Sequence, residues 1–455
     1  MDSYFELVSK QRQYFCQGHT KDLSFRIKAL TMLHQMIKTH ESELLHTLHQ
    51  DLNKSEFESY LSEIAILLEE IRFTLKHIKK WARQRKVRSS LAQFGSKSYI
   101  YPEPYGVVLI ISPWNYPFQL AIAPLIGAIA AGNCALIKPS ELTPMTSSLI
   151  AKLIEAYFPK EYISVVQGGA DTSQALLKEK FDYIFFTGSV QVGKDIMEAA
   201  AKKLTPVTLE LGGKSPCIVH RDAIIKHATK RIAWGKFINA GQTCVAPDYV
   251  YVHKDIKDEF IEMLGTAIKE MVGDVLSSGN FTRIVNDKHF NRLRSYLDDG
   301  NIVFGGNYNR NSLIIEPTIL DNPSWDNLVM KDEIFGPILP VLEYDNKVEL
   351  IESVNKRPKP LAFYIFSEDK NFIKSTLNQV SFGGGCINDV IYHLSSPYLP
   401  FGGVGESGIG AYHGKGSFDL FSHEKSILKQ TTLFDLPFRY PNNKNALKIL
   451  KTLIK

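Results

Sequence analysis

The sequence contains few cysteines, and they do not cluster. Of 455 residues, five are cysteine, and no two of them form a CxxC pair. An odd number of widely spaced cysteines indicates neither a disulfide framework nor a zinc site, so we expect no metal centre and a reducing compartment. The five cysteines are Cys16, Cys134, Cys217, Cys244 and Cys386.

Long apolar runs are absent as well, and like charges gather only in runs such as KKWARQRKVR, which fits a solvated helix end. The N-terminus, MDSYFELVSKQRQYF, lacks the apolar core of a signal peptide, and no later stretch reaches the length of a membrane-spanning helix. The net charge of +5 is spread along the chain, which gives no reason to expect a nucleic-acid partner. These absences favour a cytoplasmic globular protein, and the length predicts two or three packed units.

The pattern along the chain changes once, near residue 98. Residues 1–85 contain no proline and have helical periodicity. Short strand-like runs then alternate with helical stretches: GVVLIIS, CALIKPS, YISVVQG and YIFFTGS, followed after PVTLELGGKSPCIV by a second such series. This alternation predicts βαβ units and parallel sheets. Residues 383–385 are expected to form a glycine-rich loop, and SILKQTT a late strand that leaves the body of its domain.

Cys244 lies in the segment FINAGQTCVAPDYV, which is too polar and too interrupted by glycine and proline for the middle of a core strand. A single cysteine is compatible with two interpretations. It is either a small buried apolar residue or a nucleophile.

Two segments have features of a nucleotide site. The turn FFTGSVQVG follows a strand and opens a helix, where the amides of Gly188, Ser189 and Gly193 can face an anion. Its spacing differs from the GxGxxG fingerprint, so a purely structural turn fits equally well. Lys138 and Glu141 follow a strand, where open parallel sheets bind ligands; they are candidates for ribose contacts or simple surface charges.

Three further segments carry candidate catalytic groups. Asn115 is a neutral amide on the loop SPWNYPF, which two prolines stiffen, and this suits an oxyanion hole. Glu210 directly precedes a Leu-Gly-Gly turn, and KDEIFGP supplies Glu333 and Phe335. Each of these residues, taken alone, fits a cap, a salt bridge or a core aromatic as well.

Taken together and in this order, the segments resemble the aldehyde dehydrogenase superfamily. The motifs are SPWNYPF, IKPSE, FTGSxxxG, LELGGKSP, GQTCVAP, EIFGP and PFGGVGESGIG, and the resemblance runs from about Leu23 to about Lys429. NAGQTCVAPDYV and the short N-terminus are similar to the class 3 branch, which acts on fatty and aromatic aldehydes.

The resemblance implies an α/β fold with a Rossmann-like cofactor domain, an α/β catalytic domain and a small β element for bridging and dimerisation. The implied boundaries are 1–85 and 106–211 for NAD(P) binding, 212–420 for catalysis, 86–105 and 421–436 for bridging, and 437–455 for an amphipathic tail. The tail could dock on the protein's own dimer, which we favour, or make a weak contact with a membrane surface.

The resemblance also implies roles for single residues. Cys244 would be the nucleophile, Asn115 the oxyanion donor and Glu210 the general base. The implied cofactor contacts are Glu333 and Phe335 with the nicotinamide riboside, Lys138 and Glu141 with the adenosine ribose, and Gly188, Ser189 and Gly193 with the pyrophosphate. The implied substrate-tunnel residues are Tyr116, Trp234, Phe401 and His413.

The implied activity is NAD(P)-dependent oxidation of an apolar aldehyde to the acid through a thiohemiacetal and a thioester on Cys244. The aldehyde could be fatty, aromatic or isoprenoid. Glu141 predicts a preference for NAD, with NADP also accepted. Two alternatives are a coenzyme A-acylating dehydrogenase, against which Glu210 argues, and an inactive binding protein of the same fold.

Overall fold

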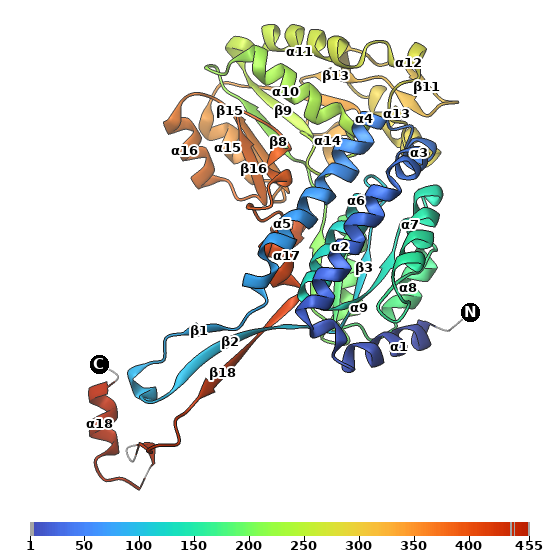
Figure 1. Cartoon of the computed structure of the whole chain (residues 1–455). Coiled ribbons are helices and arrows are strands. Elements are labelled where there is room, and N and C mark those ends of the chain that lie inside the picture. The colour runs from blue at the N-terminus through green and yellow to red at the C-terminus, as the bar shows by residue number, and fades with distance from the viewer. Residues whose placement is uncertain (1–3, 437–438, 441, 454–455) are drawn as a thin grey trace.

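Two large sheets, a small three-stranded sheet and a two-stranded hairpin organise the described chain (Figure 1). The structure is a computed structural model that describes residues 4–436, 439–440 and 442–453. Each large sheet is mostly parallel and is accompanied by helices, as the alternation of strands and helices predicts. The expected α/β fold class is therefore confirmed.

The six-stranded sheet has the order β17-β7-β6-β3-β4-β5. Its strands are β3 (Val107–Ile111), β4 (Cys134–Lys138), β5 (Ile163–Val165), β6 (Tyr183–Thr187), β7 (Val207–Glu210) and the antiparallel edge strand β17 (Gly408–Ile409). Its central strands are buried throughout because helices cover the sheet, which explains their continuous apolar runs. The strand order reverses between β3 and β6, which is where doubly wound sheets bind ligands.

Helices pack around this sheet. The connecting helices are α6 (Gln119–Ala131), α7 (Pro144–Tyr157), α8 (Ala170–Leu177) and α9 (Val190–Ala201). The N-terminal elements are α1 (Tyr4–Cys16), η1 (His19–Lys21), α2 (Leu23–Thr39), α3 (Glu41–Leu52), α4 (Glu56–Ser59), the π-helical turn η2 (Tyr60–Ala65) and α5 (Ile66–Trp81). Gln11 on α1 donates to Ala135 O at 2.9 Å, which ties these helices to β4.

The seven-stranded sheet has the order β10-β13-β14-β9-β8-β15-β16. Its strands are β8 (Pro216–Val219), β9 (Tyr249–His253), β10 (Asn301–Phe304), β13 (Thr318–Asp321), β14 (Ile338–Tyr344), β15 (Ala362–Phe366) and β16 (Gly384–Ile387), and a separate hairpin pairs β11 (Tyr308–Asn309) with β12 (Ile314–Ile315). The accompanying helices are α10 (Ile225–Phe237), η4 (Ile238–Gly241), η5 (Lys254–Ile256), α11 (Lys257–Val272), α12 (Val275–Ser278), α13 (Asp287–Leu297), α14 (Leu328–Lys331), α15 (Lys347–Asn355), α16 (Lys370–Gln379) and η6 (Tyr392–Ser395). The chain then returns to the six-stranded sheet, where η7 (Gly405–Ser407) leads into β17 and α17 (Lys415–Leu420) packs on α6.

The glycine-rich segment 383–385 corrects one expectation. It is not simply a loop, because β16 begins at Gly384 and pairs in parallel with β15. A Cβ atom on Gly385 would come within 1.9 Å of Phe363 O, and one on Gly383 within 2.4 Å of Gly402 O. These glycines therefore permit close backbone approach at the sheet edge.

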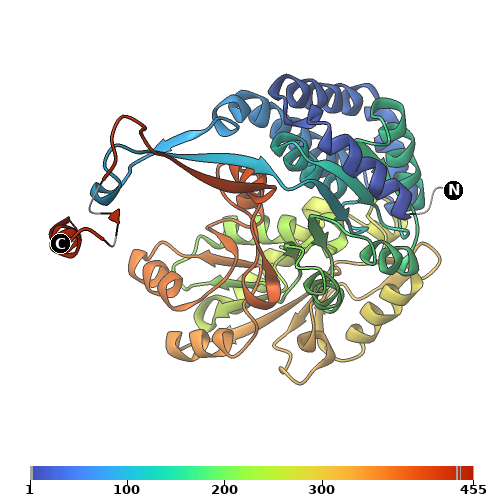
Figure 2. The ribbon, with the colours of Figure 1, turned by 90° about the horizontal axis from the view of Figure 1, so that it is seen from below.

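The small sheet projects from the body of the molecule (Figures 1 and 2). It consists of β1 (Arg85–Val87), β2 (Lys97–Pro104) and β18 (Ser422–Lys429), and β18 pairs with the full length of β2 in antiparallel register. The late strand expected in SILKQTT therefore begins earlier, at Ser422. Beyond it, α18 (Ala446–Leu453) lies against η3 (Leu91–Gln93).

The expected amphipathic tail is only partly covered by the structure. Residues 437–438, 441 and 454–455 of the 437–455 range lie outside the described residues, so the end of the expected tail, Ile454 and Lys455, is not described. Among the helices of the described chain, none is long and apolar enough to cross a membrane.

Candidate active site

The carboxyl ends of four neighbouring strands bring sequence candidates to one edge of the six-stranded sheet. Asn115 follows β3, Lys138 ends β4, Gly188 follows β6 and Glu210 ends β7. Backbone hydrogen bonds tie these ends together: Ser112 N–H donates to Lys138 O at 3.1 Å, and Gly188 N–H donates to Glu210 O at 3.0 Å. Parallel pairing thus places distant sequence motifs beside one another.

The cysteine loop has an unusual backbone between α10 and β9. Asn239 and Ala240 have φ angles of 53° and 50°, and Gly241 has a φ angle of 72°. A Cβ atom on Gly241 would come within 2.2 Å of Gly336 O, so glycine is needed there for space as well as for conformation. Left-handed residues of this kind cluster at functional sites. The turn carries Cys244, which is half-buried, to the wall of a cavity.

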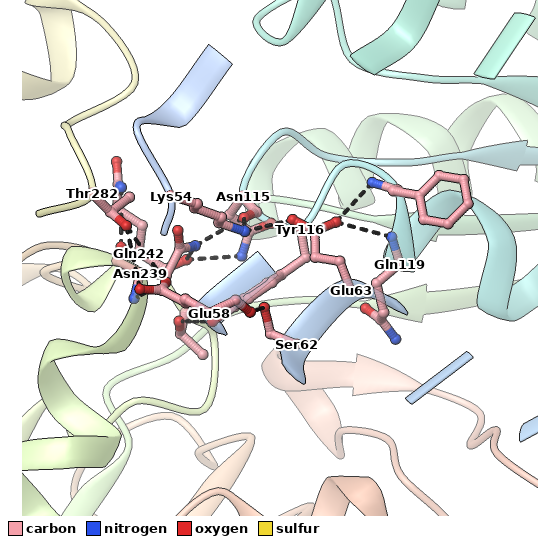
Figure 3. Close-up of polar contacts among 12 residues, drawn as sticks. Lys54, Glu58, Ser62, Glu63, Asn115, Tyr116, Gln119, Asn239, Gln242 and Thr282 are labelled. Atoms are coloured by element: carbon pink, nitrogen blue, oxygen red, sulfur yellow. Dashed lines mark hydrogen bonds and ion pairs between the residues drawn. The ribbon is translucent and has the colours of Figure 1, made fainter. Parts of the chain in front are cut away.

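Hydrogen bonds join the cysteine loop to the Asn115 loop (Figure 3). Asn115 Nδ2 donates to Gln242 O at 3.0 Å. The Gln242 side chain is itself held, because its Nε2 donates to Asn239 O and Arg283 O, both at 3.1 Å, and its Oε1 accepts from Val285 N–H at 3.1 Å. Among the described residues, Gln242 O is the acceptor for the side-chain amide of Asn115. The second N–H of Asn115 Nδ2 is therefore left for a ligand.

The cavity beside Cys244 has a volume of about 330 Å³ and a mostly apolar wall. All four residues expected in the substrate tunnel line it: Tyr116, Trp234, Phe401 and His413. Tyr116 Oη is 2.7 Å from Thr243 Oγ1, and the Trp234 ring stacks on Tyr392 with 5.2 Å between centroids. A mostly apolar pocket of this kind suits an apolar ligand.

Glu210 is buried without a partner. Its side chain is 2% exposed, and among the described residues neither carboxyl oxygen has a hydrogen-bond partner. Burial raises the pKa of Glu210 well above its usual value, because a lone carboxylate is poorly solvated there. A carboxyl group of raised pKa without a fixed partner is a candidate for acid–base work.

Glu333 is the second carboxyl group of raised pKa. Burial, together with the negative charge of Asp248, raises the pKa of Glu333 to about 8, although a hydrogen bond from the Gly213 N–H opposes the rise. A Cβ atom on Gly212 would come within 2.0 Å of Glu333 Oε2, so the carboxyl lies directly against the Gly-Gly turn after Glu210.

The negative charges of both carboxyl groups affect the pKa of the Cys244 thiol. Burial is the largest cause that raises the pKa of Cys244, followed by the charges of Glu333 and Glu210, while hydrogen bonds from the Cys244 and Val245 N–H groups oppose it. The thiol is therefore protonated at neutral pH in the state that the structure describes. A base is needed to form the thiolate, the nucleophilic form of cysteine.

The candidate cofactor residues form a second group along the same strand ends. Lys138 is buried, and its Nζ lies 3.0 Å from Glu141 Oε2. Ser189 caps α9, where its Oγ accepts from Val192 N–H at 3.4 Å. A Cβ atom on Gly193 would come within 2.6 Å of Leu211 Cδ2, so this glycine lets α9 approach the chain after β7.

Phe335 has a strained backbone, with a φ angle of 49°, and its ring makes an edge contact with Trp114 at 5.3 Å between centroids. This contact connects EIFGP to the Asn115 loop. Motif segments that lie more than two hundred residues apart in the sequence thus meet around one site.

The aldehyde dehydrogenase family model matches residues 6–427. The chain belongs to the aldehyde dehydrogenase family. It is 50% identical to the 4,4'-diaponeurosporen-aldehyde dehydrogenase of Staphylococcus aureus (strain NCTC 8325 / PS 47), over 98% of this chain and 97% of that protein. It is 45% identical to a dimeric NADP-preferring aldehyde dehydrogenase of Rattus norvegicus, over 95% of this chain and 96% of that protein.

A solved structure of the substrate-bound state of Staphylococcus aureus AldH superposes on the whole chain, with a TM-score of 0.98, 48% identity and full coverage of both chains. The expected enzyme class, an NAD(P)-dependent aldehyde dehydrogenase, is thereby confirmed for this family member.

Sequence reasoning missed most of the cavity wall and the residues that support it. The further lining residues are Leu61, Ser62, Ala65, Ile66, Glu69, Gln119, Leu120, Ile238, Thr243, Val245, Ile391, Tyr392, Leu394, Ser395 and Tyr412. Several lie on η2 and α5, where amphipathic periodicity predicts a helix but does not identify which cavity its apolar side lines. Lys54 and Glu63, both fully buried, were missed as well.

Proposed function

We propose that this aldehyde dehydrogenase oxidises an apolar aldehyde to its carboxylic acid through a thiohemiacetal and a thioester on Cys244. The observation that carries the proposal is the Cys244 thiol at an apolar cavity, with two buried carboxyl groups that raise its pKa. A nucleophile with an adjacent base is the arrangement that acyl chemistry needs.

The residues present fit a nicotinamide cofactor. Ser189 and Gly188 open α9 at the switch region of the sheet, where helix amides face a pyrophosphate, and Glu333 Oε1 is a buried acceptor without a partner among the described residues. Lys138 and Glu141 would hold the adenosine ribose, and Glu333 and Phe335 the nicotinamide riboside. When bound, the nicotinamide would accept hydride from the substrate carbon.

In the first half of the reaction, the Cys244 thiol loses its proton to a buried carboxylate, which releases that proton to solvent before the second half, and the Cys244 sulfur attacks the aldehyde carbon. The carbonyl π electrons move to oxygen, which the free N–H of Asn115 and the Cys244 backbone N–H would stabilise. The hydrogen of the former aldehyde carbon then leaves with its electron pair, and the carbonyl re-forms as a thioester.

In the second half, Glu210 would take a proton from water as the water oxygen attacks the thioester carbon. The carbon–sulfur bond breaks and the acid leaves, while the proton taken up by Glu210 passes to the Cys244 sulfur and restores the thiol. Glu210 suits this step because it is buried, without a partner and of raised pKa, so it can hold a proton near neutral pH.

The substrate class that we propose is a long or bulky apolar aldehyde, whether fatty, aromatic or isoprenoid. The apolar cavity lined by Tyr116, Trp234, Phe401 and His413 supports this choice. The name of the Staphylococcus aureus relative, a diaponeurosporen-aldehyde dehydrogenase, gives further support for an isoprenoid substrate.

A panel of aldehydes tests the proposed function. The kcat/KM for production of NADH or NADPH should rise with the chain length and apolar area of the aldehyde, and the product should be the free acid. Product that forms only when coenzyme A is added would favour the acylating alternative. Absence of turnover with every aldehyde, while cofactor still binds, would favour an inactive binding protein.

We further infer that the chain consists of a cofactor domain, a catalytic domain and a bridging element, with the boundaries 1–85 and 106–211, 212–420, and 86–105 and 421–436. We infer that the protein forms a homodimer through the bridging element. The projecting sheet of β1, β2 and β18 and the dimeric rat relative support this assembly. Sedimentation should give a dimer, and a monomer would contradict it. The cytoplasmic location remains a prediction.

For the tail, we infer docking on the protein rather than on a membrane, since α18 lies against η3 of its own chain. Liposome flotation of the full chain and of a chain that ends at residue 441 should be equal. If the full chain floats and the truncated chain does not, the tail contacts the membrane surface.

A further inference from the structure

Lys54 and Glu63 form a fully buried ion pair next to the catalytic loops. Both side chains are 0% exposed, and Lys54 Nζ lies 2.5 Å from Glu63 Oε1. Lys54 follows α3, and Glu63 lies in the π-helical turn η2. Turns of this type inside helices occur frequently at functional sites.

The pair holds the Asn115 loop at Asn115 itself and at the C-terminal end of the loop (Figure 3). Lys54 Nζ donates to Asn115 O at 2.9 Å and lies 4.2 Å from the centre of the Tyr116 ring. Glu63 Oε2 accepts from Phe118 N–H at 2.9 Å and from Gln119 N–H at 3.1 Å. The backbone from Asn115 to the start of α6 is therefore held by one charged pair.

The same N-terminal segment also reaches the cysteine loop. Glu58 accepts from Asn239 N–H at 2.6 Å. Asn239 Nδ2 in turn donates to Asn115 O at 2.8 Å and to Gln242 O at 3.1 Å. Residues 54–63 thus contact both loops that would surround the reacting carbonyl.

Stability alone is a weak reason for such a pair. Taking two charges out of water costs several kcal/mol, and apolar residues of similar volume often replace a buried ion pair without loss. What apolar residues cannot supply is the donor to Asn115 O and the acceptor for the first N–H groups of α6. The two charged groups are suited to fixing backbone groups in place.

We propose that Lys54 and Glu63 are positioning residues that fix the Asn115 amide toward Cys244 before negative charge develops on the substrate oxygen. The inference rests on the proposed role of Asn115 as oxyanion donor. Donors that are fixed in advance need no reorganisation during the reaction.

The experiment measures the first-turnover rate of NADH formation by rapid mixing, with the full-length enzyme. Lys54→Met combined with Glu63→Leu removes both charges, so neither is left buried alone. We expect the burst to slow about a hundredfold, the effect of about 1 Å of misplacement, with the Kd for NAD unchanged. Lys54→Met combined with Glu63→Gln keeps an acceptor for the first N–H groups of α6, so it should slow the burst by a smaller factor.

A double-mutant cycle with Asn115→Ala separates positioning from a general structural effect. Asn115→Ala alone should slow the burst by about 10²- to 10³-fold. In that background the Lys54→Met/Glu63→Leu change should slow it by no more than about twofold further. Full additivity, or a normal burst in the pair variant, would overturn the positioning role while the function of Asn115 stands. A normal burst in Asn115→Ala would overturn both.

Lys257→Met is the matched control. Lys257 is also buried and ion-paired, with 2.8 Å from its Nζ to Asp321 Oδ1. It lies beyond the C-terminal end of β9, whereas Cys244 precedes the N-terminal end of that strand. It should lower stability without changing the burst. A slowed burst in this control would mean that the pair variants report lost stability, and the positioning role would fall.

Discussion

Glu63 and Glu210 are both buried glutamates, 0% and 2% exposed, yet their surroundings differ completely. Glu63 accepts from Lys54 Nζ and from two backbone N–H groups, whereas Glu210 has no partner among the described residues. A buried carboxylate is costly unless it is paired. We infer that the paired carboxylate holds the loops and that the unpaired one is left free to react.

The largest expected effect is on Cys244, the thiol that Glu210 would serve. Cys244→Ser should abolish dehydrogenase turnover with little change in folding or NAD binding, since a serine alkoxide is not formed near neutral pH. Serine replacements of the other four cysteines should remain active. Alkylation by a limiting amount of an aldehyde-like electrophile, followed by peptide mapping, checks the assignment, and labelling of another cysteine before Cys244 would contradict it.

Glu210→Gln should divide the reaction at the thioester. If Glu210 serves deacylation alone, a burst of NADH near one equivalent per site should remain, with steady-state turnover lowered by about two to four orders of magnitude. Intact-mass measurement should find the acyl group on Cys244.

Other results for Glu210→Gln would assign the base differently. Loss of the burst would mean that Glu210 also activates the thiol. Near-normal turnover would make Glu333 the base. A stalled enzyme released only by coenzyme A would favour the acylating alternative.

Substitution of the two glutamates should also have different effects on the free energy of unfolding. Glu63→Gln leaves Lys54 without its counter-charge and should cost about 3–5 kcal/mol of unfolding free energy. Glu210→Gln removes an uncompensated carboxyl group and should cost nothing or stabilise slightly. Urea unfolding at pH 7 compares them, and equal losses would mean that Glu210 has a structural partner.

Glu333 predicts a pH dependence of stability in the cofactor-free enzyme. Its pKa is raised from 4.5 to about 8, so between these values the folded state binds more protons than the unfolded state. Stability should fall as pH rises through this window, by at most about 1.4 kcal/mol per pH unit, and Glu333→Gln should flatten that fall. Superimposable profiles of wild type and variant from pH 5 to 8 would contradict burial of this carboxyl.

The sequence predicts more of the fold than of the site's support. Continuous apolar runs such as VVLII and YIFFT identify buried parallel strands, and the strand-turn-helix pattern locates Gly188 and Ser189. Lys54 and Glu63 look like ordinary surface charges of an amphipathic helix, because their burial depends on a loop more than fifty residues away. The expectation of a loop at residues 383–385 was wrong for a similar reason, since the backbone of Phe363 and Gly402, distant in sequence, makes glycine necessary at Gly385 and Gly383.

The smallest expected effect concerns Glu141, an exposed carboxylate paired with buried Lys138 at 3.0 Å. A carboxylate at the ribose repels a 2′-phosphate, so we expect NAD to be preferred, although Lys138 offsets part of the repulsion and the rat relative prefers NADP. Glu141→Gln should raise kcat/KM for NADP relative to NAD by about 1.5- to 5-fold, because exposed charge interactions contribute about 0.2–1 kcal/mol. Glu155→Gln removes a comparable exposed, paired carboxylate from α7 and should leave the ratio unchanged. An unchanged ratio in Glu141→Gln would remove Glu141 from the cofactor site, since a carboxylate that contacts the ribose cannot be neutralised without altering this preference.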